Sequence, residues 1–203
     1  MRKLNVLTFL SLDGVMQAPG GPEEDTSGGF RHGGWSFGYF DEVVGKEMGK
    51  QMGHGFALLL GRRTYEIFKS YWPLVKNDPT ADAINGATKY VATNRPVTKD
   101  WNTVRLDGDV AEAIRKLKAG SGPELQVHGS GTLIQTLLAN DLVDELWLKI
   151  FPATIGSGRR LFAEGTPYSG FELLESSASP SGVILAKYRR AGEVKAGSFD
   201  LPK

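Results

Sequence analysis

The stretch Leu125-Gln-Val-His-Gly-Ser-Gly-Thr-Leu-Ile134 decides the fold class, because an apolar run meets a glycine turn and then a helical pattern. Residues 125–128 predict a short buried strand, and residues 132–139 predict an apolar helix directly after the turn. The same order recurs earlier, where residues 56–60 predict a strand and residues 61–68 open a helix. Strands that alternate with helices are typical of α/β proteins with a parallel sheet.

The rest of the chain continues this alternation. Residues 4–12 are almost continuously apolar or β-branched, which predicts a central strand buried on both faces. Further strands are predicted at residues 89–93 and 145–151, helices at 41–52 and 110–117, and a terminal hairpin at 171–175 and 183–189. We therefore expect a three-layer α/β fold whose sheet is mostly parallel with an antiparallel C-terminal edge. Residues 1–190 form one domain in this prediction, and residues 191–203 form a C-terminal arm or tail.

Composition excludes several classes of protein. Of the 203 residues, 40% are hydrophobic and 23% charged, and no apolar run approaches the length of a bilayer span, so no membrane association is expected. The net charge of +1 offers no basic field for a nucleic acid. The absence of cysteine excludes disulfides, thiolate catalysis and zinc sites with cysteine ligands. Met1 leads directly into a predicted strand without a signal-peptide pattern, which predicts a cytoplasmic protein.

Residues 13–38 form an unusually long connection. They contain eight of the 26 glycines, two prolines and an acidic triplet, and they show no helical or strand periodicity. Loops of this length in compact domains are commonly functional or disordered. We expect a lid over a site, or a disordered segment.

Several strands of the predicted sheet end in residues suited to binding an anion. Glycines in Gly129-Ser-Gly-Thr132 let backbone N–H groups approach a phosphate, and the following helix adds the partial positive charge of its N-terminus. The alternative is a tight turn that merely needs positive φ. Arg62 and Arg95 begin two other loops at the same edge and would suit the 2′-phosphate of NADP(H). No G-x-G-x-x-G follows the first strand, so a dinucleotide would bind differently from a Rossmann domain.

Two other site types were weighed. Gly34-Trp-Ser-Phe-Gly38 matches the G-x-S-x-G nucleophile elbow of esterases, with His128 as a nominal base, but no strand precedes Ser36 as the elbow requires. His32, His54 and His128 show no metal-ligand spacing, so no metal site is expected.

Six motifs together resemble a known family. They are Ser11-Leu-Asp-Gly14, Gly61-Arg-Arg-Thr-Tyr-Glu66, Thr93-Asn-Arg95, His128-Gly-Ser-Gly-Thr-Leu133, Leu142-Val-Asp-Glu-Leu146 and the run from Pro152 through Gly156-Ser-Gly-Arg-Arg-Leu-Phe162. In this order they resemble the dihydrofolate-reductase-like superfamily, and more closely the stand-alone proteins related to the C-terminal reductase domain of the riboflavin-biosynthesis deaminase/reductase. The resemblance covers roughly residues 3–190.

The resemblance implies an NADPH-dependent reductase with a dihydrofolate-reductase-like fold. In the Gly61 turn, Arg62 would meet the 2′-phosphate and Thr64 the pyrophosphate. Thr93, Asn94 and Arg95 would line the adenosine end. The second glycine loop would lie against the pyrophosphate and the nicotinamide half, and its residues are Gly129, Ser130, Gly131, Thr132 and Leu133.

The substrate side offers three candidate catalytic residues. The resemblance suggests that Asp41, or its neighbour Glu42, anchors the substrate. Asp13 follows the first strand, and Lys149 shares a face with Trp147 inside an otherwise apolar strand, which indicates a cleft or a sheet edge. The expected reaction is hydride transfer to a nitrogen heterocycle, as in the reduction of 5-amino-6-(5-phosphoribosylamino)uracil. A dihydrofolate-reductase-like activity or a non-catalytic nucleotide-binding protein remain alternatives, since the riboflavin enzymes carry a glutamate where this chain has His128.

The apolar segment at residues 183–188 and the strand of Trp147 predict the antiparallel edge of the sheet. An exposed apolar edge invites pairing with another chain. Because the related reductase domains pair as homodimers, a two-fold homodimer that buries this edge is expected.

Overall fold

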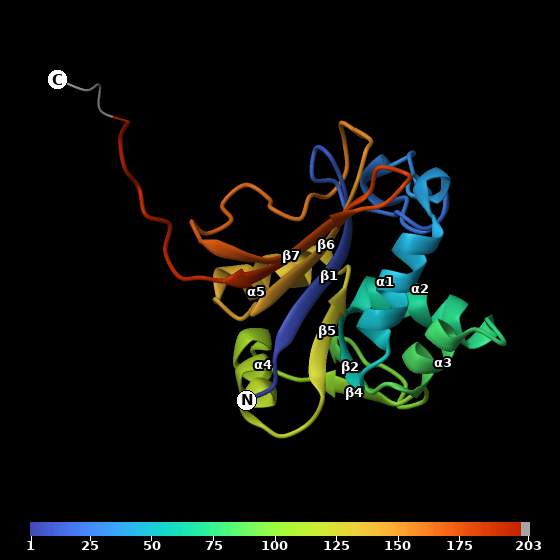
Figure 1. Cartoon of the computed structure of the whole chain (residues 1–203). Helices are drawn as coiled ribbons and strands as arrows, with labels where there is room; N and C mark the ends of the chain where they lie inside the picture. The colour runs from blue at the N-terminus through green and yellow to red at the C-terminus, as the bar shows by residue number, and fades with distance from the viewer. Residues whose placement is uncertain (200–203) are drawn as a thin grey trace.

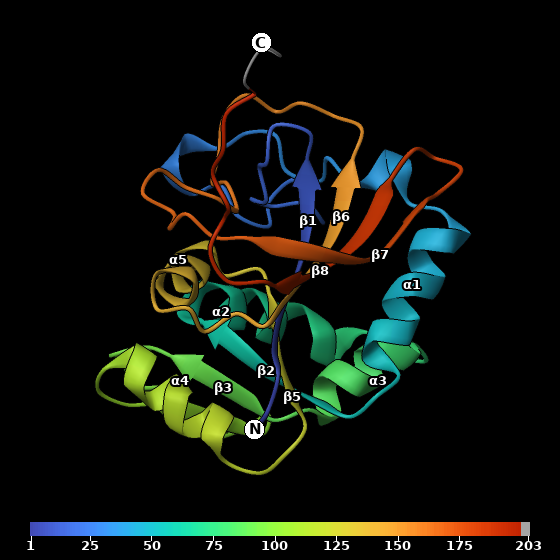
Figure 2. The same ribbon diagram turned by 60° about the vertical axis from the view of Figure 1, so that its left-hand side comes forward.

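One eight-stranded sheet forms the centre of the molecule (Figures 1 and 2). The computed structural model describes residues 1–199 of the chain. The strands are β1 (Leu4–Ser11), β2 (Phe56–Gly61), β3 (Lys89–Ala92), β4 (Thr103–Leu106), β5 (Glu124–His128), β6 (Glu145–Phe151), β7 (Phe171–Ala178) and β8 (Ile184–Arg190). Their order in the sheet is β4-β3-β2-β5-β1-β6-β8-β7. The first six are parallel, while β8 pairs antiparallel with both β6 and β7. The predicted fold class is thus confirmed.

Helices cover both faces of this sheet. They are α1 (Glu42–Met52), α2 (Arg62–Tyr71), α3 (Pro79–Gly86), α4 (Val110–Ala119) and α5 (Gly131–Ala139). Ile114 of α4 and Ile134 of α5 are fully buried in one cluster with strand residues such as Val6. On the opposite face, Tyr65 of α2 and Ile84 of α3 pack against β2. Figure 1 shows α4 and α5 on one side of the sheet and α1 and α3 on the other. The molecule therefore has three layers.

Two elements were missed in the sequence. No helix is predicted for residues 79–86, yet Asp78 caps a helix there and Pro79 takes its first position. Pro is well suited to that position because the first helical N–H has no partner in the helix. β4 is only four residues long and lies at the edge of the sheet, so its burial pattern is too short to show periodicity.

The sheet edge was assigned to the wrong strand. Residues 183–188 fall in and next to β8, which lies between β6 and β7, so β7 forms that edge. The reason is that both strands of the terminal hairpin join the sheet. The outer strand, β7, pairs only with β8, so the backbone groups on its other side have no partner strand within residues 1–199. Leu173 and Leu174 of β7 are partly exposed, with relative areas of 51% and 41%.

The glycine-rich connection is folded against the domain. It contains short 3-10 turns at Ser27–Gly29 and Phe37–Tyr39. Val15, Ala18 and Phe30 are buried together with Trp35 packed on them. The backbone also joins a distant loop, since Met16 N donates to Arg159 O at 2.8 Å. This packing places the connection beside the carboxyl ends of the parallel strands.

After β8, residues 191–199 form no helix or strand, and Figure 1 shows this segment leading away from the sheet. Gly170 N donates to Gly192 O at 2.8 Å, which ties the start of the segment to the domain. Residues 200–203 of the predicted arm lie outside the described residues. Within residues 1–199, every helix is too short or too polar to cross a bilayer.

Candidate functional site

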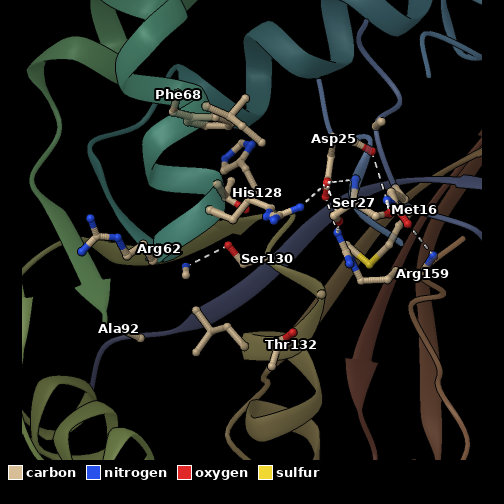
Figure 3. A pocket seen from close by; sticks show the side chains of 18 of the residues that line it. Met16, Asp25, Ser27, Arg62, Phe68, Ala92, His128, Ser130, Thr132 and Arg159 are labelled. Atoms are coloured by element: carbon tan, nitrogen blue, oxygen red, sulfur yellow. Dashed lines mark hydrogen bonds and ion pairs between the residues drawn. The ribbon is translucent and has the colours of Figure 1, made fainter. Parts of the chain in front are cut away.

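A cavity of about 520 Å³ opens at the carboxyl ends of β2, β3 and β5. Gly61, Ala92 and His128 mark the ends of these strands. In open α/β sheets this edge is the usual place for a ligand. Figure 3 shows Ser130 between Arg62 on one side and the cluster of Asp25 and Arg159 on the other. The remaining wall comes from the glycine-rich connection, from the first half of α2, from the N-terminal residue of α4 and from α5. These residues are Met16, Gln17, Ala18, Glu24, Ser27, Arg63, Thr64, Ile67, Phe68, Val110, Gly131, Thr132, Leu133 and Thr136.

The N-termini of α2 and α5 meet at this cavity without side-chain caps. The N-cap residues are Gly61 and Ser130, and neither supplies a side-chain oxygen to its own helix. The hydroxyl of Ser130 instead accepts from the backbone N–H of Gly61 at 2.8 Å, which joins the two turns. The first N–H groups of both helices are therefore left for water or a ligand. Together with the helix dipoles, these N–H groups form a wall of the cavity that is suited to an anion.

The glycines of the two turns are required by close packing. A Cβ on Gly61 would lie 3.3 Å from Cβ of Ser130, tighter than most real contacts. Gly129 has φ of +79°, which favours glycine, and Ser130 follows in the left-handed region with φ of +69°. The tight-turn interpretation of the glycine turn is thus confirmed, and the phosphate-binding interpretation stays a prediction. A phosphate group fits the donors that this geometry presents.

The two arginines predicted to converge differ in position. Arg62 lines the cavity, and its guanidinium donates to Glu66 at 2.6 Å and to the carbonyl of Pro96 at 2.9 Å. Arg95 does not line it, and neither do its neighbours Thr93 and Asn94. Gly129 also lies behind the lining. The structure brings Arg62 to the glycine turns, and the roles of Arg95 and its neighbours stay predictions.

An ion cluster across the cavity wall was not foreseen. The Asp25 carboxylate accepts from Arg63 at 2.5 Å, from Arg159 and from the Ser27 hydroxyl at 2.6 Å. The side chain of Arg159 also lies beside Gly131, the first residue of α5. A Cβ added to Gly131 would lie 3.7 Å from Cδ of Arg159. These residues come from three separate segments of the chain, so periodicity gave no signal for them. The cluster places two guanidinium groups, both paired with Asp25, in the wall of the cavity.

His128 lines the cavity beside Phe68 (Figure 3). Its Nε2 lies 2.9 Å from Oε1 of Gln126, on the same face of β5. Burial, reinforced by the nearby charge of Lys149, lowers the pKa of His128 to about 3. The imidazole is therefore neutral at physiological pH.

The three predicted catalytic residues hold structure together instead of facing the cavity. The Asp13 carboxylate accepts from the Ser11 hydroxyl at 2.6 Å and from two backbone N–H groups after β6. Asp41 caps α1 by accepting from Val44 N at 3.0 Å and also accepts from the backbone N–H of Ser181. These hydrogen bonds hold the pKa of both carboxyl groups well below 3.8.

Lys149 is buried under α1, and its Nζ donates to the side-chain oxygen of Gln51. Burial lowers its pKa to about 8. Its strand, β6, lies inside the sheet, so the alternative of a lysine at a sheet edge is wrong. A catalytic role for Lys149 stays a prediction.

The esterase motif lacks the required setting. Ser36 lies in the glycine-rich connection, three per cent exposed, and its hydroxyl donates to the carbonyl of Pro19 at 2.7 Å. A nucleophile elbow would place it between a strand and a helix. Among the described residues, no group of three histidine, aspartate or glutamate side chains is arranged to hold a metal ion.

Comparisons with known proteins give a consistent result. The model of the RibD C-terminal domain family matches residues 2–185. The uncharacterized protein YyaP of Bacillus subtilis (strain 168) is 27% identical over 141 residues, which cover 66% of this chain and 74% of YyaP. YwjB, an uncharacterized protein of the same organism, is 31% identical over 110 residues, 54% of this chain and 59% of YwjB.

Solved structures share the fold. A candidate riboflavin biosynthesis protein from Shewanella sp. PV-4 aligns with a TM-score of 0.64 and 21% identity, covering 93% of this chain and 99% of its own. A pyrimidine reductase-like protein from Corynebacterium diphtheriae NCTC aligns with a TM-score of 0.60 and 14% identity, over 95% and 93% of the two chains. Because the family model spans residues 2–185, the chain belongs to the RibD C-terminal domain family.

Proposed function

We propose that the protein is an NADPH-dependent reductase that transfers hydride to a planar nitrogen heterocycle. Membership of the RibD C-terminal domain family suggests a reductase with a nicotinamide cofactor. The observation that carries the proposal is the meeting of two uncapped helix N-termini at one cavity of about 520 Å³. A pyrophosphate needs such a set of backbone donors.

The cofactor would span the two glycine turns. Thr64 and the first turn of α2 would bind one side of the pyrophosphate, and Gly131 with Thr132 the other side. Arg62 would hold the 2′-phosphate, because it lies in the cavity wall and can form two parallel hydrogen bonds with a phosphate. When bound, NADPH supplies the hydride, and the protein aligns the reactants and excludes water.

Calorimetric titration of NADPH and NADH tests the cofactor. An arginine–phosphate pair contributes on the order of 1.5–3 kcal/mol, so NADPH should bind roughly 10- to 100-fold more tightly than NADH. Equal affinities would remove the role of Arg62, and no binding of either nucleotide would overturn the proposal.

The substrate belongs, in this proposal, to the uracil-type pyrimidines that carry a ribosylamino group. The test is NADPH consumption with the ribosylaminopyrimidine intermediate of riboflavin synthesis, with dihydrofolate and with small quinones. We expect turnover with the pyrimidine. Turnover of dihydrofolate alone would assign the other activity, and tight NADPH binding without turnover would favour a non-catalytic nucleotide-binding protein.

We also propose that the chain forms a homodimer through the β7 side of the sheet. β7 has one unpaired edge, and Leu173 and Leu174 expose apolar surface beside it. Light scattering coupled to size exclusion should give twice the 22.1 kDa of one chain. A mass of one chain at micromolar concentration would contradict the dimer.

A further inference from the structure

Three polar side chains follow one another on a single face of β5 and end at the cavity. Glu124, Gln126 and His128 alternate along the strand, so their side chains point to the same side of the sheet. Such a row is unusual under a helix, where apolar residues normally lie. It forms a hydrogen-bonded chain from a carboxylate through an amide to an imidazole.

The direction of this chain is fixed by its partners. Nε2 of Gln126 lies 2.8 Å from the backbone carbonyl of Gln51 and 2.7 Å from Oε1 of Glu124. Both partners can only accept, so the amide nitrogen must face them. The other carboxylate oxygen of Glu124 accepts from Nδ2 of Asn5 at 3.0 Å, which holds the carboxylate in place. Gln126 therefore presents its carbonyl oxygen to His128.

This orientation sets the tautomer of His128. Oε1 of Gln126 is an acceptor 2.9 Å from Nε2, so Nε2 must carry the hydrogen. A neutral imidazole with Nε2–H has an unprotonated Nδ1. The groups around the ring are Lys149, whose charge disfavours protonation, and the rings of Phe56 and Phe68, each 6.4 Å away.

The Nδ1 atom is left for a ligand. Within residues 1–199, no hydrogen-bond partner of Nδ1 is found. Nδ1 is also not sealed from solvent, because Oδ1 of Asn5 is the sole side-chain polar atom of these residues that is both sealed and unpartnered. Nδ1 is thus an unpartnered atom with some access to solvent, and it belongs to a side chain that lines the cavity.

We propose that His128 determines substrate specificity: its Nδ1 accepts a hydrogen bond from an N–H group of a planar lactam-type heterocycle. Gln126 is a positioning residue that keeps the hydrogen on Nε2. A ligand that offers a carbonyl oxygen or an N-alkyl group at this place would meet a second acceptor or a steric contact, and would be rejected. This inference rests on the proposed function only for the ligand class.

The tautomer can be tested on the free protein. In 15N spectra of histidine-labelled protein, His128 should show a protonated Nε2 and an unprotonated Nδ1 at pH 7 and again at pH 5. His128→Gln identifies its signals against those of His32 and His54. An Nδ1–H tautomer or an imidazolium at pH 7 would overturn the proposal, and neither outcome depends on cofactor or substrate.

Variants of Gln126 test its positioning role. Gln126→Leu should give a mixture of tautomers, because Nε2–H loses its acceptor. Gln126→Glu should make His128 protonate at a higher pH, because a carboxylate then lies beside Nε2–H. Gln135→Leu is the control, since Gln135 donates to the carbonyl of Leu161, makes no hydrogen bond with His128 and does not line the cavity. An unchanged His128 spectrum in both Gln126 variants would contradict the role.

Uracil and 1,3-dimethyluracil form a matched pair of probes with and without N–H groups. Uracil should shift the Nδ1 resonance of His128, and dimethyluracil should not. His128→Leu should weaken uracil binding about 2- to 10-fold, the range expected for one neutral hydrogen bond. Equal responses to the two probes, or none to either, would overturn the inference.

A parallel NADPH titration separates the two proposals. If NADPH fails to bind while uracil shifts Nδ1, the proposed cofactor fails and the role of His128 stands. If NADPH binds but His128 responds to neither probe, the role of His128 alone fails.

Discussion

The helices of this domain begin in two different ways. At α1, α3 and α4 an aspartate caps the first turn, with Asp41 accepting from Val44 N at 3.0 Å, Asp78 from Ala81 N at 2.9 Å and Asp109 from Glu112 N at 2.8 Å. At α2 and α5 the N-cap residues are Gly61 and Ser130, without a side-chain cap.

The difference follows the position of the cavity. α1 and α3 contribute nothing to its lining and α4 contributes Val110, whereas α2 and α5 line it with their first turns. A cap contributes about 1 kcal/mol to stability by satisfying the first N–H groups. The two uncapped helices forgo that stabilisation and keep their donors for a ligand. If the proposed cofactor binds there, stability and binding are divided among helices of one domain.

The largest effect is expected from Gly61→Asp, which gives α2 a carboxylate at its N-cap. Like charges about 5 Å apart at an effective dielectric constant of about 20 repel by about 3 kcal/mol, so NADPH affinity should fall about 100-fold. Calorimetry measures this loss. Gly61→Ala is the control because it adds the same Cβ beside Ser130 without the charge. Equal losses in both variants would assign the effect to crowding and contradict the anion site.

A smaller effect is expected from Arg62→Gln, which removes one guanidinium from the cavity wall. NADPH affinity should fall roughly 10- to 100-fold while NADH affinity stays constant, because only NADPH carries the 2′-phosphate. The matched variant is Arg95→Gln, outside the lining. A larger loss in Arg95→Gln than in Arg62→Gln would show that Arg95, and not Arg62, holds the 2′-phosphate.

Removing a cap whose side chain does not itself line the cavity should affect stability alone. Asp109→Ala should lower the free energy of unfolding by about 1 kcal/mol and the melting temperature by about 2–4 °C, with NADPH affinity unchanged. Thermal denaturation and calorimetry on one preparation measure both. Asp107→Ala is the control, since Asp107 pairs with Arg105 and caps no helix. If NADPH binding fell with stability, the division of roles among the helices would be wrong.

The smallest effect is the acid dependence of the α1 cap. Hydrogen bonds hold the folded pKa of Asp41 well below 3.8, so its charge stabilises the fold above about pH 4 and loses this effect as the pH falls further. Asp41→Asn keeps a capping oxygen without the charge. The urea midpoint of the wild type should exceed that of the variant by the largest amount at pH 7 and by a smaller amount at pH 3. A constant difference would show that the charge of Asp41 is not involved.

Much of the fold was predictable because it depends on local pattern. The strand–helix alternation and the antiparallel hairpin follow from the spacing of apolar residues. The turns follow from glycine, which adopts backbone conformations that other residues avoid. α3 has a local signal in Asp78-Pro79, an N-cap residue followed by proline at the first helical position, although no helix was predicted there. β4 has no such signal, because a four-residue strand at the edge of a sheet is partly solvated and needs no alternation of apolar and polar residues.

The candidate site was predictable only in part, because carboxylates have the same local pattern whether they bind a ligand or a backbone. Asp13 and Asp41 were expected at the substrate, yet backbone N–H groups from residues 155, 156 and 181 occupy them. Asp25 drew no attention within an acidic triplet, but it binds Arg159, 134 residues away. No local pattern can identify such partners.

The sequence by itself determined the elements and the two turns that begin α2 and α5, because a glycine beside a strand end is a local conformational requirement. Tertiary structure alone decided that these turns face each other through Gly61 and Ser130, and that β7 forms the edge. It also decided the state of His128, since Gln126 is oriented by the carbonyl of Gln51, 75 residues away. Such assignments depend on which groups meet in space, and a hydrogen bond exists only once both partners are in place.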